Sequence, residues 1–476
     1  MLFNSFDFLV FLPTVFLLYW FVINKKLNWQ NLFLLITSYV FYGWWDYRFL
    51  ALILFSSIID FTAGLKIYKA ISVKHKKLWL ALSIIVNLGF LGVFKYFNFF
   101  SESLIHFLSL FGWQADALTI NVILPVGISF YTFQTMSYTI DVYRGKLKPT
   151  KNMTAFFAYV SFFPQLVAGP IERATNLLPQ FYQKRKFNYD KAADGMRQIL
   201  WGLFKKIVVA DNAAVVVNQV FDNYYEQSGS NLIIGVVFFA FQIYGDFSGY
   251  SDIAIGTSRL FGFNLKQNFA FPYFSRDIAE FWRRWHISLS TWFRDYVYIP
   301  LGGSRGSTWM KVKNTFIIFI VSGFWHGANW TFIAWGTLNA LYFLPLLLLN
   351  NNRKNLGTVA EGSYLPNIKE IIQLSFTFFM TILAWVFFRA SSITIAFDYI
   401  RRIFSKSLFY FPNIDLKPFI YIAILILFEW FHRTKIHGLE ISYIKTPLIR
   451  WSFYVLIFCL ILIFGASSQS FIYFQF

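Results

Sequence analysis

Apolar stretches long enough to cross a membrane recur along this 476-residue chain, which is 57% hydrophobic and 14% charged. A helix of about 20 apolar residues spans the hydrocarbon core, and in lipid only helices and closed barrels satisfy their backbone hydrogen bonds. The stretches are continuous and do not alternate between apolar and polar residues, which argues against a barrel. The sequence therefore predicts an all-α polytopic membrane protein with about ten or eleven transmembrane helices. Partial or re-entrant helices and interfacial helices are expected beside them.

The distribution of basic residues indicates membrane topology. The net charge of +19 would also suit a nucleic-acid-binding protein, but the basic residues lie in short loops between apolar stretches. Lys25 and Lys26 follow the first stretch, lysines within 66–77 follow the third, and a basic loop at 144–151 follows the fifth. This alternation predicts an N-terminus outside, these loops in the cytoplasm, contact with anionic membrane lipids and no nucleic-acid partner.

The chain shows no repeat of fixed short period, so one membrane domain over residues 1–476 is expected. Hydropathy predicts an interfacial helix at 101–111, and Pro170 is expected to break a short apolar stretch that begins at 156. The expected spans are residues 8–23, 31–45, 49–65, 78–99, 120–140, 231–255, 374–388, 418–431 and 451–464.

An ionisable residue lies inside the longest uncharged stretch. No residue from 315 to 350 has a fixed charge, yet this stretch contains His326. As one helix it would measure about 54 Å against about 30 Å of hydrocarbon, so it must break, and residues 326–329 are the natural place. An ionisable group at that depth costs several kcal/mol unless it is paired or faces a wet cavity. His326 is therefore a functional candidate; the alternative is a ring satisfied by a neighbouring helix.

Two other segments place polar groups near membrane depth. Residues 275–299 are rich in Arg and Trp and are expected to form an amphipathic helix with His286 in its pattern, which is typical of an interfacial anchor. In the span at 231–255, Asp246 and Tyr250 lie near glycines on one helical face, an arrangement that suits close packing around a polar interior. That face is compatible with a structural polar seam and with a substrate-lining role.

These residues alone leave two kinds of chemistry open. The histidines and Asp246 or Asp252 lack the helix-face spacing of a metal site, so no metal is expected. A single cysteine, Cys459, excludes an internal disulfide. A neutral buried imidazole can take a proton from a hydroxyl that attacks a carbonyl, and broken helices offer N–H groups for an oxyanion. Acyl transfer therefore fits better than transport, but both remain possible.

Several motifs, in order along about residues 5–345, resemble those of the membrane-bound O-acyltransferase (MBOAT) family. Within that family they are most similar to the bacterial O-acetyltransferases that act on alginate or peptidoglycan. The motifs are FPQLVAGPIER at 163–173, YGDFSGYSD at 244–252, FWRRWHISLS at 281–290, RDY at 294–296, PLGG at 300–303 and SGFWHG at 322–327.

The resemblance implies a ring of helices around a funnel that meets a tunnel from the other face. By position, His326 matches the family's membrane histidine and His286 its second histidine. His326 would then be a general base or transient acyl acceptor, and His286 would line the tunnel and orient the substrate. The further candidates for the substrate-binding wall of the cavity are Asp246, Tyr250, Arg283, Trp325 and Asn329.

The resemblance also implies an enzyme of the bacterial inner membrane. It would relay acetyl groups from cytoplasmic acetyl-CoA, without a bound cofactor, to an extracellular or periplasmic polysaccharide, directly or through a periplasmic partner acetyltransferase. The alternatives are a D-alanyl relay for teichoic acid and a polysaccharide or lipid transporter without covalent chemistry. Within the single domain we expect N-terminal spans in 1–153, a catalytic core with broken helices in 154–350 and C-terminal spans in 351–476.

Overall fold

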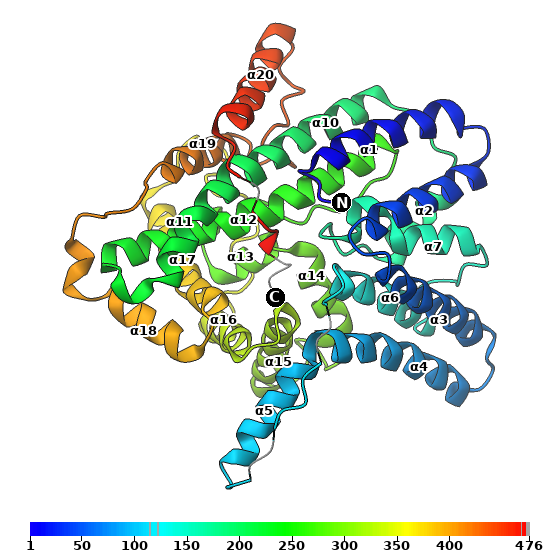
Figure 1. Cartoon of the computed structure of the whole chain (residues 1–476), viewed down its shortest axis with the longest axis horizontal. Coiled ribbons are helices and arrows are strands. Elements are labelled where there is room, and N and C mark those ends of the chain that lie inside the picture. The colour runs from blue at the N-terminus through cyan, green and yellow to red at the C-terminus, as the bar shows by residue number, and fades with distance from the viewer. Residues whose placement is uncertain (114–115, 121–122, 468, 473–476) are drawn as a thin grey trace. The chain divides into compact units, whose positions relative to one another are not determined.

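The computed structural model of the chain describes residues 1–113, 116–120, 123–467 and 469–472, and every regular element in these residues is a helix (Figure 1). This confirms the all-α membrane architecture. Apolar helices of 10–17 residues, shorter than the candidate spans, are found at Phe6–Val22 and Pro418–Phe431. The expected number of ten or eleven transmembrane helices stays a prediction. The expected funnel that meets a tunnel also stays a prediction. The six helices that are long and apolar enough to cross a membrane are Phe49–Lys69, Val73–Ser109, Gly229–Leu260, Trp330–Leu348, Ile368–Arg389 and Pro447–Phe464.

The chain divides into two compact units. The first comprises Met1–Ala192 and Thr257–Leu265, and the second comprises Ala193–Gly256 and Lys266–Phe476. The expected organisation as one membrane domain stays a prediction.

In the first unit, helix α3 packs against α4 and α6 (Figure 1). A buried carboxylate, Asp60 of α3, lies at this contact and accepts hydrogen bonds from Ser83 and Asn87 of α4. Buried polar side chains therefore form hydrogen bonds between these apolar helices. The α-helices are α1 (Phe6–Leu17), α2 (Leu27–Gly43), α3 (Phe49–Lys69), α4 (Val73–Leu91), α5 (Phe97–Ser109), α6 (Ile128–Tyr143), α7 (Met153–Ser161), α8 (Phe163–Leu166) and α9 (Ala174–Leu177), with π-helical η1 (Leu18–Val22) and η2 (Gly92–Tyr96) and the 3-10 helix η3 (Leu178–Tyr182).

One expectation for the first unit stays a prediction and another was wrong. The helix expected at 101–111 lies largely within α5, which the π-helical turn η2 joins to α4 in one helical run from Val73 to Ser109, and its interfacial position stays a prediction. The span expected at 120–140 becomes helical only at Ile128, because Pro125 lacks an N–H donor and Gly127 has a φ of +74°. Residues 121–122 of that expected span lie outside the described residues.

The remaining helices lie in the second unit, except that the first residues of α10 and the last residues of α12 belong to the first unit. The predicted span at 231–255 is confirmed as part of α12, and those expected at 374–388, 418–431 and 451–464 lie within α17, α19 and α20. These helices are α10 (Tyr189–Leu203), η4 (Phe204–Ala210, π), α11 (Asp211–Asp222), η5 (Tyr224–Glu226, 3-10), α12 (Gly229–Leu260), η6 (Pro272–Phe274, 3-10), α13 (Ile278–Arg284), α14 (Ile287–Phe293), η7 (Arg294–Tyr298, π), α15 (Thr308–His326), α16 (Trp330–Leu348), α17 (Ile368–Arg389), α18 (Ile393–Ile403), η8 (Lys406–Phe409, 3-10), α19 (Pro418–Phe431) and α20 (Pro447–Phe464).

The break predicted at 326–329 is confirmed. Helix α15 ends at His326, and α16 begins at Trp330 and packs beside α15 (Figure 1). The two helices approach closely at Gly323, where an added Cβ would collide with the main-chain oxygen of Phe332. Small residues at a helix contact permit this approach in membrane proteins. The hairpin therefore places His326 at a tightly packed helix end.

The prediction of a single amphipathic helix at 275–299 was wrong, because the segment breaks at His286 into α13 and α14. Trp285 still donates its N–H to the main-chain oxygen of Phe281, as in a helix, but Ile287 donates its N–H to the main-chain oxygen of Asn268 at 2.9 Å. His286 itself adopts a left-handed conformation with a φ of +44°. This region costs a residue other than glycine about 1–3 kcal/mol and is concentrated at functional sites.

Candidate active site

His286 is buried and is held by one asparagine side chain. Its Nδ1 lies 3.1 Å from Oδ1 of Asn268, a residue with no exposed surface. The same oxygen accepts from the backbone N–H of Ser288 at 3.2 Å and from its hydroxyl at 2.8 Å, while Nδ2 of Asn268 donates to Ser251 at 3.1 Å. These bonds fix the orientation of the Asn268 amide, so its oxygen faces the imidazole.

The Asn268 contact determines the tautomer of His286. A carbonyl oxygen can only accept, so Nδ1 carries the proton and Nε2 is the basic nitrogen. His286 lies outside the candidate membrane spans, and burial lowers the pKa of its imidazole to about 3. Lack of solvation disfavours the imidazolium form. His286 is therefore neutral at physiological pH, with Nε2 oriented as a proton acceptor.

His326 lies at the C-terminal end of α15 within a group of aromatic rings. Its side chain is 3% exposed. The imidazole centroid lies 5.2 Å from the ring of Trp335 on α16 and 5.4 Å from that of Phe388 on α17. Trp335 in turn stacks on Trp385 at 5.7 Å. Three helices thus hold the predicted catalytic histidine in a largely apolar setting that excludes bulk water.

Trp325 contacts both histidines. Its indole lies 5.0 Å from the ring of His326 and 6.1 Å from the ring of His286. Phe247 of α12 packs edge-on against His286 at 4.7 Å. The structure therefore brings together three of the residues predicted from sequence, His286, Trp325 and His326, from two separate motifs.

Asp246, by contrast, belongs to a buried ion cluster. Its Oδ1 lies 2.7 Å from Nζ of Lys206, which also pairs with Asp211 at 2.8 Å. Its Oδ2 accepts from the backbone N–H of Ile472 at 2.7 Å. Both carboxylate oxygens thus have partners within the protein, and a substrate-binding role for Asp246 stays a prediction.

The other three predicted wall residues have contacts with residues other than the two histidines. Tyr250 packs its ring on Phe471 at 4.6 Å. Arg283 donates to the main-chain oxygens of Asn352 at 2.8 Å and Asn355 at 2.7 Å. Asn329 caps α16 by accepting from the N–H of Thr331 and donates to the oxygen of Ser391. Their role in binding substrate stays a prediction.

Sequence reasoning missed Asn268 and Lys206. Asn268 lies outside the helices, 18 residues before His286, so no spacing pattern connects the two. Lys206 interrupts an apolar stretch that begins at 196, and a lysine there requires a buried partner. Searching for that partner among the carboxylates of the neighbouring span would have suggested Asp246.

The helical membrane fold and the comparisons with known proteins identify an integral membrane acyltransferase. The MBOAT, membrane-bound O-acyltransferase family model matches residues 150–388, which include both histidines. The probable alginate O-acetylase AlgI of Pseudomonas aeruginosa is 41% identical over 406 residues, covering 85% of this chain and 75% of that protein. The chain therefore belongs to the membrane-bound O-acyltransferase family.

Two other relatives have names that describe different activities. The peptidoglycan O-acetyltransferase of Helicobacter pylori is 36% identical over 430 residues, covering 84% of this chain and 79% of that protein. The teichoic acid D-alanyltransferase of Streptococcus thermophilus is 31% identical over 252 residues, covering 49% of this chain and 60% of that protein. The similarity to the peptidoglycan O-acetyltransferase therefore covers a much larger share of this chain.

Asn268→Leu and Asn268→Asp test whether Asn268 positions His286. Leucine removes the acceptor for Nδ1, and we expect acyl transfer to fall about 10-fold to 100-fold, as for other residues that orient a functional histidine. Aspartate keeps an acceptor but adds a charge that raises the pKa of His286. Below that raised pKa Nε2 is protonated, so the rate of Asn268→Asp should fall as pH is lowered from 8 to about 5.

Gln267→Leu is the matched control for both variants, because its amide donates to the main-chain oxygens of Phe269 and Ile436 and not to His286. It should keep the wild-type rate and pH profile. Rates and pH profiles of both Asn268 variants equal to wild type would contradict a positioning role.

Proposed function

We propose that this protein transfers acetyl groups from acetyl-CoA to hydroxyl groups of a polysaccharide outside the cytoplasm, directly or through a partner transferase. The single observation that supports this best is the pair of buried histidines against one indole, Trp325. The names of the two relatives that cover most of this chain, alginate O-acetylase and peptidoglycan O-acetyltransferase, favour acetyl as the transferred group and a glycan as the acceptor.

In the proposed reaction His326 acts as general base. Its imidazole takes the proton of the acceptor hydroxyl, whose oxygen forms a bond to the thioester carbonyl carbon. The carbon–sulfur bond then breaks, and the CoA thiolate leaves and takes up a proton. His286 orients the acceptor.

The proposed location is the inner membrane of a bacterium, with the N-terminus outside. Lys25, Lys26 and the basic loops at 66–77 and 144–151 then face the cytoplasm, where acetyl-CoA is found. The acceptor approaches from the opposite side. This division of substrates between two faces is the reason that we favour a relay across the membrane.

The test uses the full chain in proteoliposomes with acetyl-CoA labelled in its acetyl group, alginate or peptidoglycan fragments as acceptor, and a D-alanyl carrier protein in a parallel reaction. We expect release of the CoA thiol and label on the glycan. Label from the D-alanyl carrier alone would support the teichoic acid relay instead. Movement of glycan without any thioester donor would support a transporter.

A single-turnover reaction without acceptor distinguishes the two roles of His326. A transient acyl-histidine releases CoA in a burst equal to the amount of enzyme, whereas a general base gives no burst. We expect no burst.

A further inference from the structure

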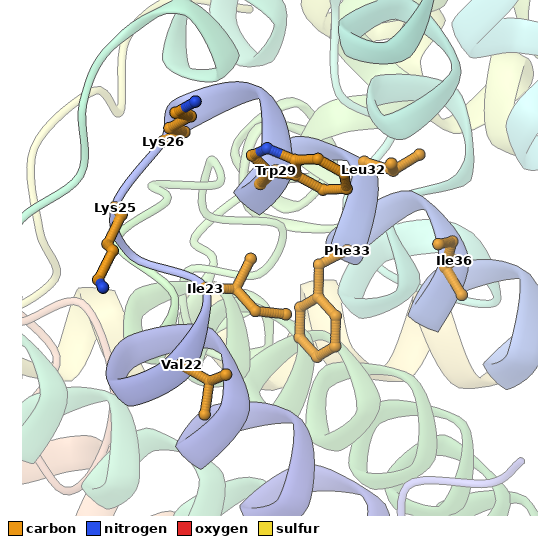
Figure 2. Close-up of a pocket in the computed structure, with 8 residues that line it drawn as sticks. All are labelled: Val22, Ile23, Lys25, Lys26, Trp29, Leu32, Phe33 and Ile36. Carbon is orange, nitrogen blue, oxygen red and sulfur yellow. The ribbon is translucent and has the colours of Figure 1, made fainter.

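Two adjacent hollows in the first unit have complementary linings. The first, of about 470 Å³, is bounded by the loop between η1 and α2 and by the start of α2. Figure 2 shows Lys25 and Lys26 on that loop, at one end of the hollow, and Ile36 farther along α2. The other lining side chains are apolar: Val22, Ile23, Trp29, Leu32 and Phe33. One end of this hollow is therefore cationic and the rest is apolar.

The second hollow, of about 570 Å³, shares Lys25 with the first and has three more cations. These are the consecutive residues Lys184, Arg185 and Lys186, which lie in the segment between η3 and α10. The next residue, Phe187, holds this segment in place, because its ring packs on Trp20 at 5.6 Å and on Phe16 at 6.0 Å. Neither hollow has an acidic residue in its lining.

Arg185 is a buried cation with neutral acceptors only. Its side chain belongs to a residue that is 8% exposed. It donates to Oδ1 of Asn31 at 2.7 Å and to the main-chain oxygen of Gln180 at 3.3 Å. Its guanidinium also lies 4.8 Å from the ring of Phe263. A buried charge is stabilised most by an opposite charge, and the lining of the hollow does not supply one.

The apolar hollow opens among side chains that suit lipid rather than water. Val22, Trp29 and Ile36 are 62%, 60% and 52% exposed in a protein that spans a membrane. Trp29 lies beside the lysines, and tryptophan is enriched where the membrane meets water. A soluble anion would leave the apolar hollow empty, and a neutral lipid would leave the cations without a partner.

We propose that these two hollows form one binding site for an anionic phospholipid. The phosphate of the lipid lies among Lys25, Lys184 and Arg185, and one acyl chain lies in the apolar hollow along α2. Basic pockets between membrane helices bind anionic head groups, and each basic residue at such a surface strengthens the attraction. The site is independent of the acyl-transfer reaction, so either proposal can fail without the other.

The test is a lipid titration of the full chain in neutral detergent, followed by native mass spectrometry. The probes are dioleoylphosphatidylglycerol, zwitterionic dioleoylphosphatidylcholine and the soluble head group glycerophosphoglycerol. We expect the phosphatidylglycerol to bind at least about 10-fold more tightly than the phosphatidylcholine. Equal affinities for the two lipids, or complete displacement of phosphatidylglycerol by the soluble head group at equal concentration, would overturn the proposal.

Two variants test the contributions of the cations and of the apolar hollow to lipid binding separately. Lys25→Gln/Lys184→Gln removes two exposed cations and should weaken phosphatidylglycerol binding about fivefold per lysine. Leu32→Trp fills the apolar hollow, keeps every charge and should also weaken binding. The matched control is Lys74→Gln/Lys77→Gln, two exposed lysines near the start of α4. Equal binding by Lys25→Gln/Lys184→Gln and this control would refute the site.

Discussion

His326→Ala should lower acyl transfer by about 100-fold to 10,000-fold, the usual contribution of a general base. The expected loss is large because the imidazole is 3% exposed, so water cannot easily take its place. The measurement is transfer of label from acetyl-CoA by purified protein in proteoliposomes, together with release of the CoA thiol. Both signals should fall together.

Two further variants show whether the loss is specific to the basic imidazole of His326: His326→Gln, which conserves volume, and His75→Ala, which is the control. Glutamine keeps most of the volume between the rings of Trp335 and Phe388 but cannot act as a base near neutral pH, so it should be as inactive as alanine. His75 is exposed, and its removal should leave the rate unchanged. A folded His326→Ala protein that retains more than half the wild-type rate would show that His326 is structural.

The position of His326 at a helix end could be predicted because it follows from the length of one uncharged stretch of the sequence. An uncharged stretch over residues 315–350 exceeds the thickness of a bilayer as one helix, so a break was expected, and residues 326–329 were its natural place. The structure has that break between His326 and Trp330.

The conformation of His286 could not be predicted, because a distant partner determines it. Its local pattern is helical, and the left-handed turn arises where Asn268 offers its main-chain oxygen to Ile287 and its side chain to Nδ1. Periodicity reports which face of a helix is apolar but not which loop residue competes with the helix for hydrogen bonds. The contact of Trp325 with both histidines is likewise a tertiary contact between separate motifs.

Lys206→Met should destabilise the fold by about 3–5 kcal/mol, the usual cost of removing one partner from a buried charge cluster. Nζ of Lys206 lies 2.8 Å from Asp211 and 2.7 Å from Asp246, and all three side chains are at most 3% exposed. Nζ also donates to the main-chain oxygen of Gln469 at 3.1 Å. Without the lysine, two carboxylates stay buried with no cation between them. The measurement is the apparent Tm in detergent, followed by tryptophan fluorescence.

The triple variant Lys206→Met/Asp211→Asn/Asp246→Asn is the decisive comparison. It has no ions in the cluster, so it should recover much of the Tm that Lys206→Met alone loses, because residues in one ion network do not contribute additively. The triple variant also tests the cluster for a second role: if it is stable but inactive, the cluster also acts in the reaction, and if it is stable and active, the cluster, Asp246 included, serves the fold alone. A Tm of Lys206→Met equal to wild type would contradict the prediction and would mean that protonation or water stabilises these carboxyl groups without the lysine.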